Sequence, residues 1–258
     1  MRYSVAMKNF DAPHDDIATP SNDTPRRFIA LFDIDGTLVG KRHADKLQAG
    51  IRALDLAGEH VLGAPRLTAQ INFAGATDLS VARQMLRAAG HREDPDVIQR
   101  LLDTYAARIG DFVDDNPYVP LGDPEAAVRA TERIGGIIGL GTGNLRHTAF
   151  VKLASAGIAH LFRPECGGYG DDAEDRAALL ATGVSRCSPH ETLPVVVIGD
   201  TPRDMTAALE IGALAIGVPH DAITPDMLNQ SGAHAVVPHL DATLGPLIDS
   251  LLRRQTID

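Results

Sequence analysis

Two acidic residues directly follow a strongly apolar segment near the start of the chain. Residues 28–39 read Phe-Ile-Ala-Leu-Phe-Asp-Ile-Asp-Gly-Thr-Leu-Val, and the apolar run is typical of a strand buried on both faces. Asp33 and Asp35 end that run, and Gly36 permits a turn that would bring both carboxylates to one pocket. Such close acids repel each other unless a cation or a shared proton compensates. The pattern predicts a hard metal such as Mg²⁺, a carboxylate nucleophile and a second carboxyl that moves a proton. A simple turn after a strand is the alternative.

A second group of polar residues follows the apolar segment 137–140. Here the chain reads Gly141-Thr142-Gly143-Asn144 before a segment with helical spacing. Glycines let the backbone approach an anion closely, and free amides at a helix start favour phosphate. A plain turn and a dinucleotide-binding loop are the alternatives, and Asn144 at the position of the third glycine argues against the second.

A third candidate lies in residues 195–204, which read Val-Val-Val-Ile-Gly-Asp-Thr-Pro-Arg-Asp. The apolar residues predict a strand that ends at Asp200, while Thr201 as N-cap and Pro202 as first helical residue begin a helix. Asp204 falls in the first turn of that helix, where acids also occur simply because they complement the helix dipole. In an open parallel sheet, ligands bind beyond the carboxyl ends of the strands, where all three candidates would meet.

The elements that would position these residues form two groups. Residues 45–117 show helical periodicity with few buried strands, and they predict a small helical cap domain. Residues 26–44 and 118–258 alternate strands with helices, which predicts an α/β core: a Rossmann-like, mostly parallel sheet with helices on both faces. Residues 1–25 are polar and predict a mobile extension without a secretory signal.

Composition narrows the classes of partner. The chain has 258 residues, a formal net charge of −10 and 44% hydrophobic residues, so it can bury a core and would repel nucleic acid and anionic membranes. No apolar run approaches the roughly 20 residues of a membrane-spanning helix. The two cysteines, Cys166 and Cys187, show no metal-ligand spacing and indicate neither a disulfide framework nor a zinc site. We therefore expect a reducing, cytoplasmic location.

Together these segments resemble the haloacid dehalogenase-like (HAD) superfamily. Asp-Ile-Asp-Gly-Thr-Leu resembles its first motif, Gly-Thr-Gly-Asn its second and Gly-Asp-Thr-Pro-Arg-Asp its fourth, in family order. The resemblance implies that Asp33 is the nucleophile and Asp35 the acid and base. It also implies that Thr142, Gly143 and Asn144 bind phosphate.

The resemblance further implies a Mg²⁺ site. Asp33, the Asp35 carbonyl and Asp200 would hold the ion, with Asp204 as a further ligand or a support. Residues 73–78, Phe-Ala-Gly-Ala-Thr-Asp, resemble a cap segment of the phosphoglycolate phosphatase-like subgroup, although an N-capped helix start would look the same.

The cation of the third motif has two candidates. Lys152 lies ten residues after Thr142, so a straight helix at 1.5 Å per residue would place it about 15 Å from the phosphate loop. We expect that a lysine side chain cannot reach back over this distance. Arg176 follows the next strand segment, and we expect it to contact Asp33 and the phosphoryl group as the catalytic cation. We expect Arg176 to be the third-motif residue, although the commonest family pattern has Lys followed by Pro. A solvated arginine on the surface is the alternative. His220 follows the segment 214–218 and is the one histidine that we place near the cleft.

These expectations indicate a Mg²⁺-dependent phosphatase that acts on a small phosphorylated metabolite. A phosphomutase of the beta-phosphoglucomutase kind shares every motif and remains an alternative. A non-catalytic module that binds phosphate or a protein is the second alternative. A dehalogenase is disfavoured, because that branch lacks the acid that Asp35 supplies.

Overall fold

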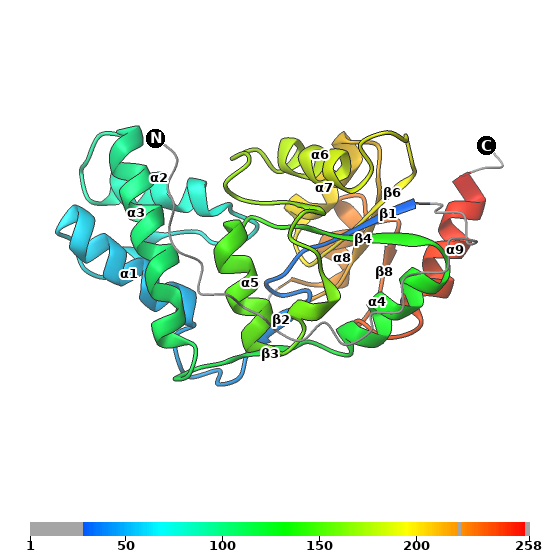
Figure 1. Cartoon of the computed structure of the whole chain (residues 1–258), viewed down its shortest axis with the longest axis horizontal. Coiled ribbons are helices and arrows are strands. Elements are labelled where there is room, and N and C mark those ends of the chain that lie inside the picture. The colour runs from blue at the N-terminus through cyan, green and yellow to red at the C-terminus, as the bar shows by residue number, and fades with distance from the viewer. Residues whose placement is uncertain (1–27, 221–222, 256–258) are drawn as a thin grey trace.

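The computed structural model describes residues 28–220 and 223–255 (Figure 1). The predicted extension over residues 1–25 lies outside this range. In Figure 1 the sheet and its helices fill the centre and right of the view, and helices α1, α2 and α3 lie at the left. None of the described helices combines the length and the apolar character that crossing a membrane requires.

A parallel sheet forms the core, which confirms the predicted α/β fold class. Within the described residues it has six strands in the order β5-β4-β1-β6-β7-β8, with every neighbouring pair parallel. β1 lies inside the sheet, and all five of its residues are buried. The strands are β1 (Phe28–Phe32), β4 (Gly136–Gly141), β5 (Gly167–Gly168), β6 (Val195–Gly199), β7 (Leu214–Gly217) and β8 (Ala235–Val236).

Helices cover both faces of the sheet. Alternate residues of β1 point to opposite faces, so Phe28, Ala30 and Phe32 join one hydrophobic cluster while Ile29 and Leu31 join the other. The first cluster takes side chains from α4 (Pro124–Arg133), α5 (Arg146–Ser155) and α9 (Leu244–Gln255). The second takes them from α6 (Arg176–Cys187), α7 (Pro202–Glu210) and α8 (Pro225–Gln230). This two-sided burial explains why the strands read as uninterrupted apolar runs.

The segment between β1 and α4 is mainly helical. It contains α1 (Ala49–Leu62), α2 (Asp78–Ala88) and α3 (Pro95–Arg108), with short 3₁₀ helices at Leu67–Gln70 and Ile109–Phe112. Asp94 caps α3 through the Asp96 amide at 2.9 Å, with Pro95 in the first position, as its sequence predicts. An antiparallel ribbon of β2 (Val39–Lys41) and β3 (Tyr118–Pro120) joins this segment to the core.

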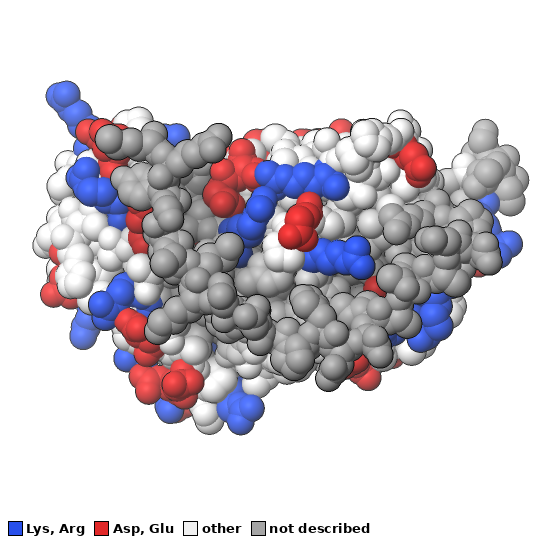
Figure 2. Space-filling model, in the orientation of Figure 1, with Lys and Arg blue, Asp and Glu red and all other residues white. Residues whose placement is uncertain are grey.

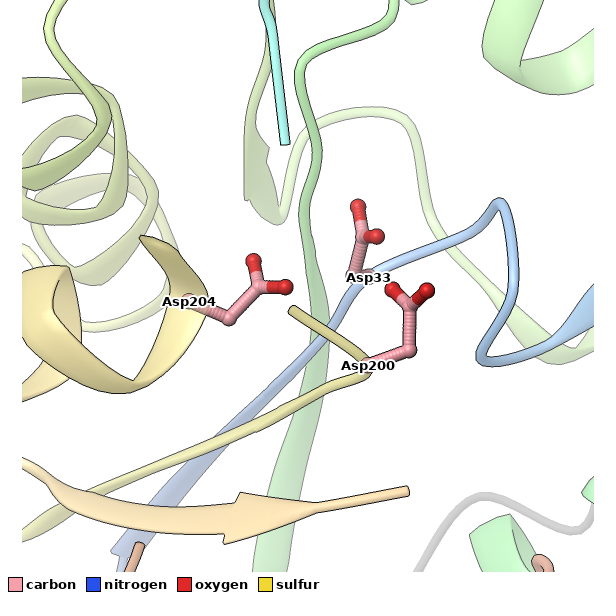
Figure 3. Close-up of side chains that lie close together, drawn as sticks. All are labelled: Asp33, Asp200 and Asp204. Atoms are coloured by element: carbon pink, nitrogen blue, oxygen red, sulfur yellow. The ribbon is translucent and has the colours of Figure 1, made fainter. Parts of the chain in front are cut away.

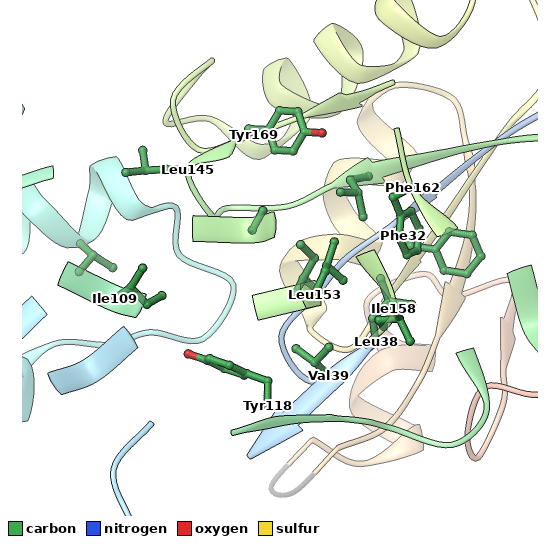
Figure 4. Close-up of a cluster of buried hydrophobic side chains, with 14 of the residues drawn as sticks. Phe32, Leu38, Val39, Ile109, Tyr118, Leu145, Leu153, Ile158, Phe162 and Tyr169 are labelled. Atoms are coloured by element: carbon green, nitrogen blue, oxygen red, sulfur yellow. The ribbon is translucent and has the colours of Figure 1, made fainter. Parts of the chain in front are cut away.

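One hydrophobic cluster runs continuously from the sheet into the helical segment. Figure 4 shows Phe32 of β1 packed near Phe162, with ring centroids 6.1 Å apart, and shows Tyr118 and Ile109 at the side of the helical segment. The same cluster includes Leu54, Leu101 and Tyr105 of α1 and α3. Shared burial therefore packs the helical segment against the edge of the sheet where the candidate residues lie.

The two cysteines form a disulfide, so the prediction of no disulfide is wrong. Cys166 directly precedes β5 and Cys187 is the last residue of α6, with their Cα atoms 4.5 Å apart. They are 21 residues apart in sequence, and α6 packs back on β5, as the close approach of Gly168 to Gly183 shows. Sequence spacing could not reveal this contact. We expected a reducing location because the cysteines indicated no disulfide, and the disulfide removes that reason. The cytoplasmic location stays a prediction.

Candidate active site

Three aspartates meet at the carboxyl edge of the sheet. Asp33 follows β1 directly, Asp200 follows the neighbouring strand β6, and Asp204 lies in the first turn of α7. Each offers a carboxylate oxygen within 4.8 Å of the others, and all three side chains are buried. Figure 3 shows the Asp33 and Asp200 carboxylates side by side, with Asp204 turned toward them from α7. The residues that the sequence placed at separate strand ends therefore form one cluster.

The turn after Asp33 requires glycine. Gly36 has a φ of 80°, and a Cβ atom there would lie 2.1 Å from an Asp200 carboxylate oxygen. The amides of Leu38 and Val39 both donate to the Ile34 carbonyl, at 2.9 Å each. This tight turn keeps Asp35 at the edge of the sheet beside Asp33, as the sequence predicts.

Arg176 lies against the acidic cluster, in the position that the sequence reasoning favoured. It is the first residue of α6, which Asp175 caps through the Ala178 amide at 2.8 Å. One guanidinium nitrogen lies 2.9 Å from the Asp33 carboxylate and 2.5 Å from that of Asp204, and it donates to the Gly141 carbonyl at 3.3 Å. The side chain is buried, so these contacts form in a region of low dielectric.

Asp204 is held firmly by its own helix start. One of its carboxylate oxygens accepts hydrogen bonds from the Thr201 amide at 3.0 Å and the Thr201 hydroxyl at 2.7 Å, which completes a capping box. The other oxygen pairs with Arg176. Thr201 thus holds one oxygen of Asp204, while the other lies in the ion pair with Arg176 but has no hydrogen bond among the described residues. Asp200 accepts a long hydrogen bond from the Thr37 hydroxyl, at 3.5 Å.

Burial and mutual repulsion raise the pKa values of Asp33 and Asp200. Burial raises the pKa of Asp33 to about 6; Arg176 opposes the rise, and Asp204 and Asp35 add to it. Burial raises the pKa of Asp200 to about 9, with repulsion from Asp33 and Asp204 adding to the effect. A divalent cation between Asp33 and Asp200 would relieve this repulsion, and a donor set of oxygens alone suits Mg²⁺.

Lys152 lies inside the site, so the prediction that it cannot reach the phosphate loop is wrong. Its ammonium group lies 2.6 Å from an Asp35 carboxylate oxygen and 2.6 Å from the Asn144 side-chain oxygen. Helix α5 begins only at Arg146, so the straight-helix distance from Thr142 was too long. In addition, a helical side chain points back toward the helix N-terminus, and lysine has a four-carbon stem. Arg176 and Lys152 thus each contact one acid of the first motif.

Asn144 connects these groups. Its side-chain nitrogen donates to Asp35 and to the Thr142 hydroxyl oxygen, at 2.8 Å each, and its oxygen accepts from Lys152. The Thr142 oxygen accepts this bond, which leaves its own proton available for a ligand. Thr142 follows β4 directly, and Gly143 faces the cavity described below.

Asp78 ties the helical segment to the phosphate loop. Its amide donates to the Gly143 carbonyl at 2.7 Å, and its carboxylate accepts from the Leu145 amide at 2.8 Å and the Thr148 hydroxyl at 3.2 Å. Burial raises the pKa of Asp78 to about 6, with Lys152 acting in the opposite direction. Thr77 also caps α2 through the Ser80 amide at 3.2 Å. Residues 73–78 thus form a capped helix start that also contacts the core. Sequence reasoning singled this segment out but did not find the Asp78 carboxylate contact.

A cavity of about 420 Å³ lies between the core and the helical segment. Its core side includes every predicted site residue except Asp204, and His220 lies there as expected. Its other side comes from α1, α2, α3 and residues 73–76. Two buried tyrosines, Tyr105 and Tyr118, were not predicted to line it. The size fits a small molecule, and the polar groups converge on one end.

Comparison with known proteins identifies the family and the fold. A model of the haloacid dehalogenase-like hydrolases matches residues 29–212. No curated protein matches the chain.

Several solved structures resemble the chain at low sequence identity, so the likeness concerns the fold alone. A beta-phosphoglucomutase from Clostridium difficile is 12% identical with a TM-score of 0.62, and the match covers 91% of this chain and 100% of the other. CbbY from Rhodobacter sphaeroides, in complex with phosphate, is 15% identical with a TM-score of 0.61, over 85% and 96% of the two chains. A hydrolase from Pseudomonas syringae is 18% identical with a TM-score of 0.56, over 87% and 98%.

Proposed function

Because the chain belongs to the haloacid dehalogenase-like hydrolase family, we propose that it is a Mg²⁺-dependent phosphatase of a small phosphorylated metabolite. The observation that carries the proposal is the pairing of each first-motif acid with its own buried cation. Asp33 contacts Arg176 and Asp35 contacts Lys152, at 2.9 and 2.6 Å. Separate partners suit two carboxyl groups with different tasks, one as nucleophile and one as acid and base.

In the proposed reaction an Asp33 oxygen attacks phosphorus, and the bond from phosphorus to the ester oxygen breaks. Asp35 gives its proton to the departing alkoxide, so an alcohol leaves and an aspartyl-phosphate remains. Asp35 then takes a proton from water, whose oxygen attacks the same phosphorus. Inorganic phosphate leaves, Asp33 is restored as a carboxylate, and Asp35 again holds a proton.

Neighbouring side chains position these groups. Arg176 offsets the repulsion between the anionic nucleophile and a phosphate, and Asp204 holds Arg176 in place. The free Thr142 proton and the Gly143 backbone suit a phosphoryl oxygen. Asn144 orients Asp35 and Thr142, so we assign its side chain to positioning rather than to phosphate contact.

Asp33, Asp200 and the Asp35 carbonyl would hold Mg²⁺. Bound there, the ion neutralises charge on the phosphoryl oxygens. One Asp204 oxygen accepts two hydrogen bonds from Thr201, and the other forms an ion pair with Arg176. We therefore place Asp204 behind the metal ligands.

We further propose that residues 45–117 act as a cap domain over the core formed by 26–44 and 118–258. Side chains of α1, α2 and α3 line the cavity opposite the acidic cluster, where they would exclude water from the reacting groups. The β2 and β3 ribbon would be the connection about which this cap moves.

A panel of phosphate monoesters tests the proposal. With Mg²⁺ the full chain should release inorganic phosphate from at least one small ester, and a chelator should abolish the release until Mg²⁺ is restored. Glucose 1-phosphate belongs in the panel, because its conversion into glucose 6-phosphate without phosphate release would instead identify a phosphomutase. Absence of turnover across the panel would support a non-catalytic binding module.

A further inference from the structure

The cap side of the active-site cavity is largely apolar. Leu54, Val81 and Tyr105 are buried there with 3%, 2% and 1% of their surface exposed. Ile51 and Phe73 add further apolar surface. The helical segment offers the cavity few polar groups: the side chains of Gln48 and Asp78 and the Tyr105 hydroxyl. A ligand group in contact with this wall would gain from apolar burial and would find few hydrogen-bond partners.

The helical segment places no cation in the cavity. Residues 45–117 are all described, and no Lys, Arg or His among them lines it. Several of their arginines form ion pairs elsewhere: Arg83 with Glu93 and Glu174 at 2.5 and 3.0 Å, Arg108 with Asp111 at 2.6 Å, and Arg52 with Asp115. On the face in Figure 2, acidic and basic side chains lie beside one another over the helical segment at the left.

The two cations on the core side of the cavity already have carboxylate partners. Lys152 pairs with Asp35, and Arg176 pairs with Asp33 and Asp204. The charged group that the helical segment does contribute is an acid, Asp78. A second anionic group on a substrate would therefore meet an apolar wall and a carboxyl group, and the described lining residues leave no further Lys or Arg for it. The other basic side chain in the described lining, His220, lies on the core side.

We propose that the substrate is the phosphate monoester of a short, uncharged alcohol with an apolar body. This inference rests on the proposed phosphatase function. A substrate carboxylate would lose its hydration without gaining a partner. A polyol such as a hexose would leave most of its hydroxyl groups unpaired against Ile51, Leu54, Phe73 and Val81.

Three esters test the inference on the full-length chain with Mg²⁺. Isobutyl phosphate and phosphoglycolate have alcohol parts of similar shape, but only the second carries a carboxylate; glucose 1-phosphate represents a polyol. We expect kcat/KM for isobutyl phosphate to exceed each of the others by about tenfold or more. One unpaired polar group costs about 5- to 150-fold, a charged group costs more, and a hexose carries several hydroxyl groups. Equal or greater kcat/KM for phosphoglycolate or glucose 1-phosphate would overturn the inference and leave the phosphatase function intact. No turnover of any phosphate ester would refute the phosphatase function itself and this inference with it.

A charge introduced into the wall provides the second measurement. Ile51→Arg should shift the ratio of kcat/KM values toward phosphoglycolate by about tenfold or more, because arginine can bind a carboxylate through two hydrogen bonds. Leu47→Arg is the matched control, because Leu47 is 61% exposed and does not line the cavity. We expect it to leave the ratio unchanged. An equal shift in both variants would mean that general charge rather than the wall determines selectivity. If Ile51→Arg does not fold, the ester comparison with the parent still decides the question.

Discussion

Replacing Lys152 with methionine removes one buried charge and keeps most of the length of the side chain. The change eliminates the 2.6 Å contacts to Asp35 and to Asn144. Hydrogen bonds to charged groups contribute about 1.5–3 kcal/mol each. The Asp35 side chain is 38% exposed, so water would replace part of the lost interaction and the lower half of that range applies. For the contact with Asp35 alone, a loss of about 1.5–2 kcal/mol corresponds to about 13- to 30-fold in rate.

The loss should appear in kcat rather than in KM, because the proposed role of Asp35 is to move a proton in the transition state. Steady-state kinetics with a phosphate ester that the parent hydrolyses provide the measurement, and thermal unfolding checks the fold. Lys46→Met is the control, since Lys46 is exposed and donates to the Asp115 carbonyl outside the cavity. A folded Lys152→Met protein within about threefold of the parent would refute the role of this contact.

Two further substitutions test the site. Arg176→Ala should lower kcat/KM by about a hundredfold or more, because the buried guanidinium contacts two carboxylates. Arg176→Lys should recover part of the loss. Equal activity in the folded parent and both variants would exclude this role. Asp78 should make the free energy of unfolding depend on pH. The pKa of Asp78 is about 6 in the folded chain, above its ordinary value of 3.8. The contribution of Asp78 to stability is therefore largely present at about pH 4 and is lost as pH rises through about 6. In urea unfolding, the stability of the parent relative to Asp78→Asn should therefore fall by about 2 kcal/mol between about pH 4 and about pH 7. A constant difference would contradict the burial argument.

Strand ends and the residues that follow them could be predicted from the sequence. The apolar runs before Asp33, Thr142 and Asp200 are long enough to identify buried strands, and parallel strands bring their carboxyl ends to one edge. The position of Arg176 also followed from this rule, because α6 begins just after the next strand of the sheet.

Contacts that depend on how a helix lies against its neighbours could not be predicted in this way. The prediction for Lys152 was wrong because distance along a helix does not give the direction in which a long side chain points. The Cys166–Cys187 disulfide joins residues that only the packing of α6 on β5 brings together. The contact of Asp78 with α5 depends on how the helical segment is placed over the core, which no local pattern determines.

The central claim is that Asp33 attacks phosphorus. Asp35→Asn should slow the hydrolysis of a phosphoenzyme more than its formation, because water needs a base and the first step can begin without one. The measurement is rapid acid quenching of this variant with an ester labelled in the phosphoryl group, followed by peptide mapping. We predict that the label resides on Asp33 and that Asp33→Asn, folded and otherwise intact, takes up no label and has no turnover. Label on another residue, or hydrolysis by Asp33→Asn within about tenfold of the parent rate, would contradict the mechanism.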